Sequence, residues 1–178
     1  MKYLLAVLLL AGMSGVMLAV LAQDAGRPQD IAVANLKDAE GKAVASATLI
    51  EDRDGVHIKL IASGLPPGLH GFHIHEKGAC DAPKFESSGG HFNPFGKKHG
   101  LKNKEGPHAG DLPNLPVNEL GVAEFTATSK LVTLGPGKNS LLGGSGTCLV
   151  IHADPDDGTT DPAGNSGVRL ACGVIEKP

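Results

Sequence analysis

The sequence has few aromatic residues and no helical periodicity. It contains no tryptophan, one tyrosine and five phenylalanines in 178 residues. A core built from Val, Leu, Ile and Ala alone contributes limited stability, so we expect disulfide bonds or bound metal ions to add to it. No long stretch repeats apolar residues every 3.6 positions, and 25 glycines and 12 prolines disfavour helices further. Together these features argue against a helical fold.

A strong charge of either sign is also missing. The formal net charge is −3 at pH 7. A mildly acidic chain gives no reason to expect nucleic-acid binding. The chain has only three cysteines, Cys80, Cys148 and Cys172. An odd count leaves one thiol over if a disulfide forms, and the sequence alone leaves all three pairings open.

Residues 1–22 read MKYLLAVLLLAGMSGVMLAVLA, a single lysine followed by a long apolar run. This pattern is typical of a secretory signal peptide cut after Ala22. An uncleaved membrane anchor is the alternative, because the apolar run approaches spanning length. The Gly, Ser and Ala interruptions favour cleavage. We therefore predict an exported protein, periplasmic or secreted, with a polar lead-in over 23–29, a domain over 30–178 and no stable membrane association.

Short segments with alternating apolar positions, separated by Gly, Pro, Asn and Asp, predict β-strands. The candidate strands are 30–37, 42–50, 56–62, 69–75, 117–128, 147–152 and 168–175, with a weaker one near 130–134. The pattern indicates an all-β, antiparallel sandwich or barrel. Two segments, 76–116 and 153–167, are too long for simple turns. Long irregular segments in a compact domain are commonly functional loops, so both are expected to build a site.

Histidines gather on these loops and the strands beside them. The stretch GFHIH carries His73 and His75 two residues apart, so both side chains point to one face of a strand, while Phe72 and Ile74 point to the other. The remaining members of the group are His91, His99 and His108 in the first loop, Asp111 shortly after them, and His152 at a late strand end. Neutral imidazole binds copper and zinc, and three histidines with an aspartate suit tetrahedral zinc. Spacing alone predicts a metal site and leaves the metal open. His57, beside Lys59, is interpreted as an ordinary surface histidine.

Five motifs in order give a more specific indication: GFHIHEKGAC, GGHFNPFGKKHG, GPHAGDL, VIHADPDD and GNSGVRLACGVI. They resemble the successive motifs of copper,zinc superoxide dismutases, above all the exported bacterial form, in which a cysteine follows shortly after the second histidine. The likeness spans about residues 30–175. It implies an eight-stranded antiparallel Greek-key barrel or sandwich, immunoglobulin-like, with two long functional loops. It also implies disproportionation of superoxide to oxygen and hydrogen peroxide by a histidine-bound copper bridged to zinc.

The resemblance further implies a role for each matching residue. Copper is assigned to His73, His75, His91 and His152, and zinc to His91, His99, His108 and Asp111. His91 and Arg169 are the implied catalytic residues, the first bridging the metals and the second holding the anion beside copper. Asp156 is implied to link a copper ligand to a zinc ligand, and His70 to be a structural histidine without metal. Cys80 and Cys172 are implied to form the disulfide, which leaves Cys148 as a small buried hydrophobe.

Capture of an anionic substrate by an acidic chain requires a local positive field. Eukaryotic members of the family place a lysine in the second loop, but residues 153–168 here hold four aspartates and no lysine. The first loop carries six lysines, and we hypothesise that some of them, with Arg169, attract the substrate: Lys77, Lys84, Lys97, Lys98, Lys102 and Lys104. A merely solvated lysine face is the alternative.

Two other functions are compatible with the same fold. One is a copper or zinc carrier or a structural zinc domain. Carrier-type relatives tend to lose copper ligands or the arginine, whereas this chain keeps them all. The other is an exported structural β-sandwich that binds metal incidentally, which the ordered motifs disfavour. Members of the family occur as monomers and as dimers, so a homodimer stays open.

Overall fold

The computed structural model describes residues 30–178. The predictions of a signal peptide over 1–22 and of a lead-in over 23–29 lie outside these residues. Within 30–178, no helix is long and apolar enough to span a membrane.

The regular secondary structure of the described chain is almost entirely β-strand, as predicted. The strands are β1 (Asp30–Asp38), β2 (Ala43–Asp52), β3 (Gly55–Ser63), β4 (Gly68–His70), β5 (Phe72–His75), β6 (Leu115–Val117), β7 (Val122–Ser129), β8 (Cys148–His152) and β9 (Arg169–Val174). One short 3₁₀ helix, η1 (Glu86–Ser88), completes the regular structure of residues 30–178.

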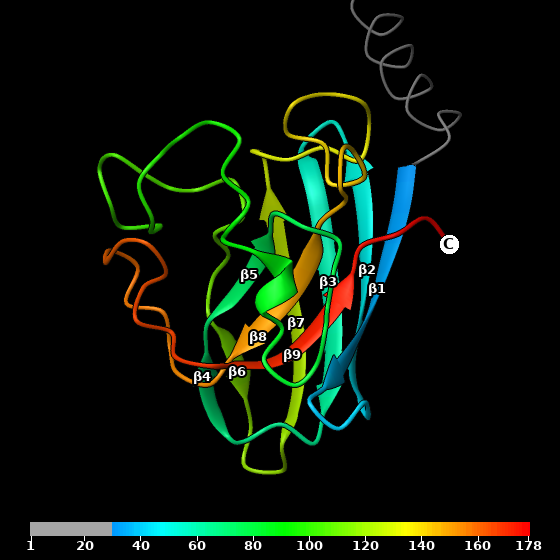
Figure 1. Cartoon of the computed structure of the whole chain (residues 1–178), viewed down its shortest axis with the longest axis vertical. Helices are drawn as coiled ribbons and strands as arrows, with labels where there is room; N and C mark the ends of the chain where they lie inside the picture. The colour runs from blue at the N-terminus through cyan, green and yellow to red at the C-terminus, as the bar shows by residue number, and fades with distance from the viewer. Residues whose placement is uncertain (1–29) are drawn as a thin grey trace, which may run out of the picture.

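The strands form an antiparallel sheet that curls on itself (Figure 1). Seven strands are hydrogen-bonded in the order β5-β8-β9-β1-β2-β3-β7, and β4 and β6 form a separate pair. The last strand, β9, therefore lies between β8 and the first strand, β1. A late strand that returns beside the first by a long connection is typical of a Greek key. The all-β, antiparallel fold class expected from the sequence is confirmed.

The interior is aliphatic, as the composition predicted. Residues that alternate along β2 and β3, such as Leu49, Ile58 and Leu60, are buried almost completely. Phe72 on β5 packs edge-to-face against Phe125 on β7, with ring centroids 5.7 Å apart. This contact ties the strand that carries two candidate ligands to the core.

Two expected strands are divided, and one does not form. The segment 69–75 splits at Gly71, whose N–H donates to Asp154 O at 2.8 Å and whose carbonyl accepts from His152 N–H at 2.8 Å. This backbone therefore bonds to the second loop and β8 instead of continuing one strand. The segment 117–128 splits at a turn closed by the Asn118 side chain, which accepts from two backbone N–H groups. Near 130–134 only an isolated bridge from Thr133 forms.

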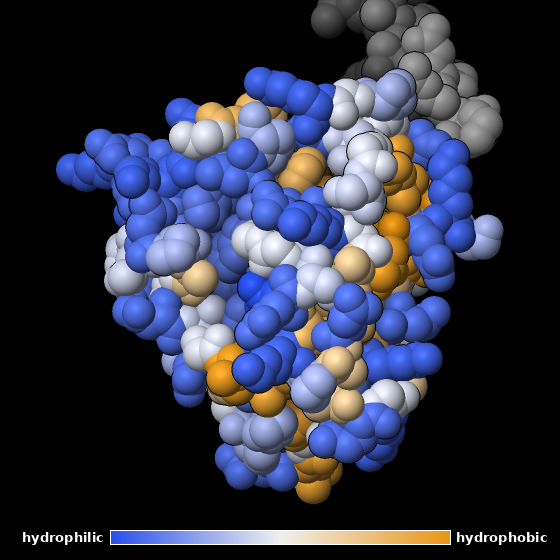
Figure 2. All heavy atoms as spheres, in the orientation of Figure 1, coloured by the Kyte–Doolittle hydropathy of each residue, from blue (hydrophilic) through white to orange (hydrophobic). Residues whose placement is uncertain are grey.

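The two long loops lie next to each other on one side of the barrel, beside β4 and β5 (Figure 1). Lys102 N–H of the first loop donates to Gly158 O of the second at 3.0 Å. His99 N–H donates to the Asp161 carboxylate at 2.6 Å. The loops present a mostly hydrophilic surface (Figure 2), so their packing is organised by polar contacts.

Candidate metal centre

Strand β5 places His73 and His75 beside the first loop. All four residues of β5 are buried. Isolated antiparallel bridges pair His73 with Asp111 and His75 with His91. The backbone of β5 thus brings residues far along the loop directly alongside its own histidines.

Four histidines converge in one cluster: His73, His75, His91 and His152. One ring nitrogen from each lies within 4.8 Å of the others, and all four residues are buried. The Nε2 atoms of His75 and His152 face each other at 3.3 Å. The rings of His73 and His91 have centroids 4.0 Å apart. The structure therefore brings together the full set that the resemblance assigned to copper.

A second cluster forms around one carboxylate oxygen, Oδ1 of Asp111. The Nδ1 atoms of His91, His99 and His108 lie 2.9, 3.1 and 3.4 Å from it. The other oxygen, Oδ2, accepts N–H groups from Gly100 at 2.8 Å and from His108 at 2.9 Å. Backbone hydrogen bonds thus fix the carboxylate, and Oδ1 points into a group of nitrogens. Three imidazoles and one carboxylate are the donors that tetrahedral zinc accepts.

His91 belongs to both clusters. Its Nδ1 faces Asp111, while its Nε2 is buried and has no hydrogen-bond partner. His73 Nδ1 and His108 Nδ1 are likewise buried without a hydrogen-bond partner. A buried polar atom without a partner is unfavourable, and a cation would satisfy these lone pairs. The donor atoms therefore fit two neighbouring metal ions.

Asp156 connects the two clusters from behind. Its Oδ2 accepts Nε2–H of His73 at 2.7 Å, and its Oδ1 accepts Nε2–H of His99 at 3.0 Å. These bonds leave Nδ1 of each ring free to face its cluster, which fixes the tautomer and the ring orientation. Asp156 is held in turn by Asn114, through its N–H to Asn114 Oδ1 and the Asn114 amide to its carbonyl, both at 2.9 Å.

Backbone carbonyls orient the other two rings. His75 Nδ1–H donates to Gly89 O at 3.0 Å, and His152 Nδ1–H donates to Gly167 O at 3.3 Å. Both bonds leave Nε2 facing the cluster. His70 lies outside it: Nδ1 contacts His152 O at 2.7 Å and Nε2 contacts Pro66 O at 2.8 Å. His70 thus bridges two backbone segments, and its structural role stays a prediction.

The electrostatics of the first cluster keep His75, His91 and His152 neutral. Burial, reinforced by the neighbouring His91 and His152, lowers the pKa of His75 to about 2. Burial likewise lowers the pKa of His91 to about 4 and that of His152 to about 3. Neutral imidazole is the form that binds a metal, so these rings are ready to do so near neutral pH.

The second cluster has the opposite balance. Burial opposes protonation of His99, but hydrogen bonds and charge from Asp111 and Asp156 outweigh it and raise the pKa of His99 to about 9. Burial alone would raise the pKa of Asp111. The neighbouring rings of His108, His91 and His99 instead hold that pKa well below its usual range. The carboxylates of Asp111 and Asp156 therefore favour a bound cation in this cluster, either a proton or a metal ion.

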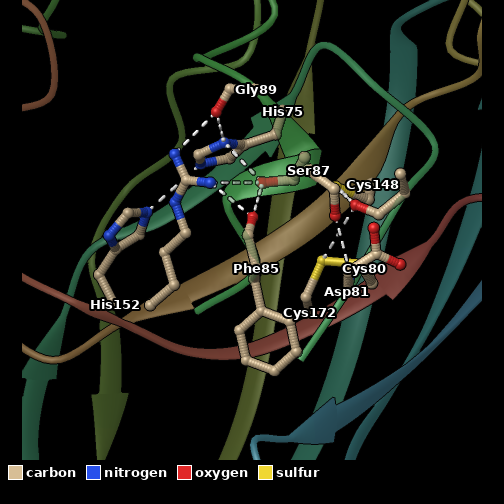
Figure 3. The surroundings of a disulfide bond; sticks show 12 residues. His75, Cys80, Asp81, Phe85, Ser87, Gly89, Cys148, His152 and Cys172 are labelled. Atoms are coloured by element: carbon tan, nitrogen blue, oxygen red, sulfur yellow. Dashed lines mark hydrogen bonds between the residues drawn. A yellow bond between two sulfur atoms is a disulfide. The ribbon is translucent and has the colours of Figure 1, made fainter. Parts of the chain in front are cut away.

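Arg169, at the start of β9, is anchored by the first loop. Its Nη1 donates to Phe85 O at 2.6 Å and to Ser88 Oγ at 2.9 Å, and its Nη2 donates to Gly89 O at 2.7 Å. Because Gly89 O also accepts from His75, the guanidinium lies next to the first cluster, whose His75 and His152 appear in Figure 3. A fixed positive charge therefore stands beside the candidate copper ligands.

The predicted disulfide is present. Cys80 and Cys172 are bonded, with Cα atoms 5.6 Å apart, and they link the first loop to β9 over 92 residues of sequence. The loop segment that follows Cys80 carries the carbonyls that hold Arg169. Cys148 is free and fully buried, as expected of a small hydrophobe. His57 also matches its prediction: it lies on the outer face, hydrogen-bonded to Asp52 and Thr128 at 2.9 Å each.

Three residues with a role in the site escaped the sequence reasoning. Ser88 is fully buried and contacts both Arg169 and His75. Asn114 positions Asp156. Gly164 leaves space for Asp156 and His99, because a Cβ at this position would collide with both side chains. Its φ of +63° also favours glycine. A buried serine or a lone asparagine in a long loop gives no local signal of such contacts.

The lysines proposed to attract substrate have mixed surroundings. Lys98 Nζ forms an ion pair with Asp161 at 2.8 Å, and Lys102 Nζ donates to Asp157 O at 3.3 Å. Both lysines therefore face the acidic second loop, which neutralises part of their field. Steering by these side chains stays a prediction.

Comparison with known proteins agrees with this geometry. The family model for copper/zinc superoxide dismutase matches residues 40–175. The chain is 55% identical over 150 residues to superoxide dismutase 2 (copper–zinc) of Aquifex aeolicus, covering 83% of this chain and 88% of that protein.

The chain belongs to the copper/zinc superoxide dismutase family.

Solved structures of this family share the fold. A superoxide dismutase-like protein from Bacillus subtilis aligns with a TM-score of 0.77 at 43% identity, covering 80% of this chain and 96% of that chain. The Cu/Zn superoxide dismutase from Brucella abortus aligns with a TM-score of 0.68 at 30% identity, covering 82% of this chain and 99% of that chain. Copper and zinc are the cofactors of the family, and both histidine clusters are compatible with them.

Proposed function

We propose that this protein is a superoxide dismutase that converts superoxide to oxygen and hydrogen peroxide. The observation that carries the proposal is the position of His91, one ring shared by a four-histidine cluster and a three-histidine, one-aspartate cluster. Its two nitrogens face different clusters, so this one imidazole would be a ligand in both metal sites. This arrangement supports a redox enzyme over a carrier, because all seven ligand residues and Arg169 are present together.

We assign the ligands as the clusters group them. His73 through Nδ1 and His75, His91 and His152 through Nε2 would hold copper. The Nδ1 atoms of His91, His99 and His108, with Asp111 Oδ1, would hold zinc. Bound copper supplies the one-electron redox change of the reaction, which zinc does not undergo.

The protein's own contribution begins with Arg169. Its guanidinium binds the small anion through charge and N–H donors, and three hydrogen bonds to the first loop hold it in place before substrate arrives. His91 then handles a proton at Nε2, the nitrogen that faces away from Asp111. This nitrogen is buried and has no hydrogen-bond partner among the described residues, so a proton held there would be available to the reduced substrate. The second proton comes from water.

Replacing Arg169 with alanine is expected to lower kcat/KM roughly 10- to 100-fold, because the local positive field and the anion's donors are lost. Arg169→Lys keeps the positive charge but lacks the forked N–H donors of the guanidinium. Its kcat/KM is therefore expected to lie between those of the wild type and Arg169→Ala. Superoxide decay after pulse radiolysis, measured against ionic strength, checks both. Equal metal content in all three proteins is the control. An Arg169→Ala enzyme with the wild-type rate and salt dependence would contradict the role.

The two clusters are expected to lose their metals at different pH. Without an ion, His99 holds a proton below about pH 9, so zinc must displace it, and zinc affinity should fall about tenfold per unit as pH decreases. His75, His91 and His152 have pKa values of about 2, 4 and 3, so copper displaces no proton from these three rings between about pH 5 and 8, and copper affinity should vary less steeply with pH than zinc affinity. Chelator competition with each metal alone, across a pH series, measures both slopes. Equal slopes would contradict this assignment.

We also propose export with cleavage after Ala22. The supporting observations are the apolar pattern of residues 1–22 and a disulfide within the domain, since such bonds persist in oxidising compartments. An intact mass that begins at Gln23 is the expected result. A homodimer remains a prediction of the family resemblance, to be tested by the mass of the protein in solution.

A further inference from the structure

Three sulfur atoms cluster beside the histidine centre. The Sγ atoms of Cys80, Cys148 and Cys172 all lie within 4.8 Å of one another. Two of them form the disulfide, and the third is the free, fully buried thiol of Cys148 (Figure 3). The dismutase mechanism uses the disulfide as a tie and gives Cys148 no role.

The three sulfurs have apolar neighbours on one side. On the other side lie the Ser88 hydroxyl and the positive charge of Arg169. Cys148 and Cys172 pack with Phe85 and Val150 in a small hydrophobic cluster of their own. Ala79 O lies 3.9 Å from both Cys148 Sγ and Cys172 Sγ. Burial raises the pKa of the Cys148 thiol to about 12, while the charge of Arg169 acts in the opposite direction. The free thiol is therefore protonated and a poor nucleophile toward the adjacent disulfide.

We propose that the chain with its Cys80–Cys172 bond open is a binding site for Cu(I), ligated by the sulfurs of Cys80, Cys148 and Cys172. Metal–thiolate bonds of about 2.3 Å place ligand sulfurs roughly 4 Å apart, a spacing that this cluster reaches with little movement once the disulfide is open. Thiolates are soft ligands and select Cu(I) over hard cations. The positive charge of Arg169 offsets part of the negative charge that metal-bound thiolates bring.

The fold holds two of the three ligands on rigid elements. Cys148 lies on β8 and Cys172 on β9, and these strands pair with Val150 opposite Cys172. Cys80 lies in the first loop and is free to adjust. Across β5 and β8, Cys148 is the register partner of His75. One ligand of the thiolate site therefore lies directly opposite a candidate copper ligand on the neighbouring strand.

Metal binding and disulfide formation exclude each other, because they use the same two sulfurs. Opening the bond takes two electrons and two protons from a dithiol, which itself becomes a disulfide. Cu(I) then replaces thiol protons and keeps its oxidation state. A newly made chain, whose thiols are not yet oxidised, offers the same three ligands. The site is separate from dismutation and does not require it.

The test uses the mature protein with both histidine clusters filled by two equivalents of zinc. The disulfide is reduced without oxygen, the reductant is removed and one equivalent of Cu(I) is added. X-ray absorption at the copper edge is expected to show sulfur ligands in the reduced protein and none in the disulfide-bonded protein. In Cys148→Ser and Cys148→Ala, one sulfur should be lost and Cu(I) affinity should fall roughly tenfold or more in competition with a chelator.

The disulfide-bonded form of each variant is the control, since it keeps the fold and lacks the site. Copper without sulfur ligands in the reduced wild type would overturn the proposal. The proposal would also be overturned if both Cys148 variants kept the wild-type number of sulfur ligands to copper and the wild-type Cu(I) affinity. Loss of the β-sheet circular dichroism on reduction also counts against it, because the site requires paired β8 and β9. Dismutation by the oxidised copper,zinc protein is measured separately, so its failure would leave the thiolate result standing.

Discussion

His91→Ala is expected to abolish dismutation, lowering kcat/KM by about a thousandfold or more. The substitution removes a donor from both clusters at once, because Nδ1 of His91 faces Asp111 and Nε2 faces the other three histidines. It also removes the ring that both clusters share and that is placed to hold a proton between them. Zinc and copper affinities should both fall, which metal analysis after dialysis against a chelator would show.

The matched control is His57→Ala. His57 lies on the outer face of the sheet and contacts Asp52 and Thr128, away from both clusters. Its loss should leave the rate and metal content at wild-type values. A His91→Ala protein that retained both metals and normal turnover would contradict the shared-ligand assignment. So would loss of only one metal together with unchanged binding of the other.

Removal of the disulfide, by Cys80→Ser combined with Cys172→Ser, is expected to give the largest loss of stability. The bond closes a segment of 92 residues, for which the chain-entropy model gives about 4–5 kcal/mol of unfolding free energy. For a domain of this size the melting temperature should drop by about 10–20 °C. Activity should fall as well, because the segment that holds Arg169 follows Cys80 in the loop.

Cys148→Ser serves as the control for this pair, since it changes a buried cysteine and leaves the disulfide in place. Calorimetry of the three proteins, with zinc and copper content matched, separates loss of the bond from loss of a buried sulfur. A double variant with the same melting temperature as the wild type would show that the bond contributes nothing to stability. Full activity in that variant would show that Arg169 is held without it.

The strands of the barrel could be predicted because their information is local. Along β3, Val56, Ile58 and Leu60 alternate with polar or exposed neighbours, and burial follows that alternation. Where strands stop was harder to predict. The break at Gly71 depends on hydrogen bonds to Asp154 and to His152 N–H, residues some 80 positions away in sequence.

Some features of the site could be predicted from local sequence, and others could not. Spacing in GFHIH was enough to place His73 and His75 on one side, and the cluster of histidines indicated a metal. The partition into two sets came only from the family resemblance, since it depends on loop residues folding back onto β5 through bridges such as His73 with Asp111. Ser88 and Asn114 act through contacts across the fold, which no local pattern encodes.

The measurement that tests the central claim most directly is superoxide dismutation by residues 23–178 loaded with zinc alone and with copper plus zinc. Superoxide dismutases are known to approach the diffusional ceiling, about 10⁸–10⁹ M⁻¹s⁻¹. The account predicts such a rate for the copper,zinc protein and negligible activity for the zinc-only protein. Tight binding of one copper and one zinc without any dismutation would contradict it, and would instead favour a metal carrier on the same fold.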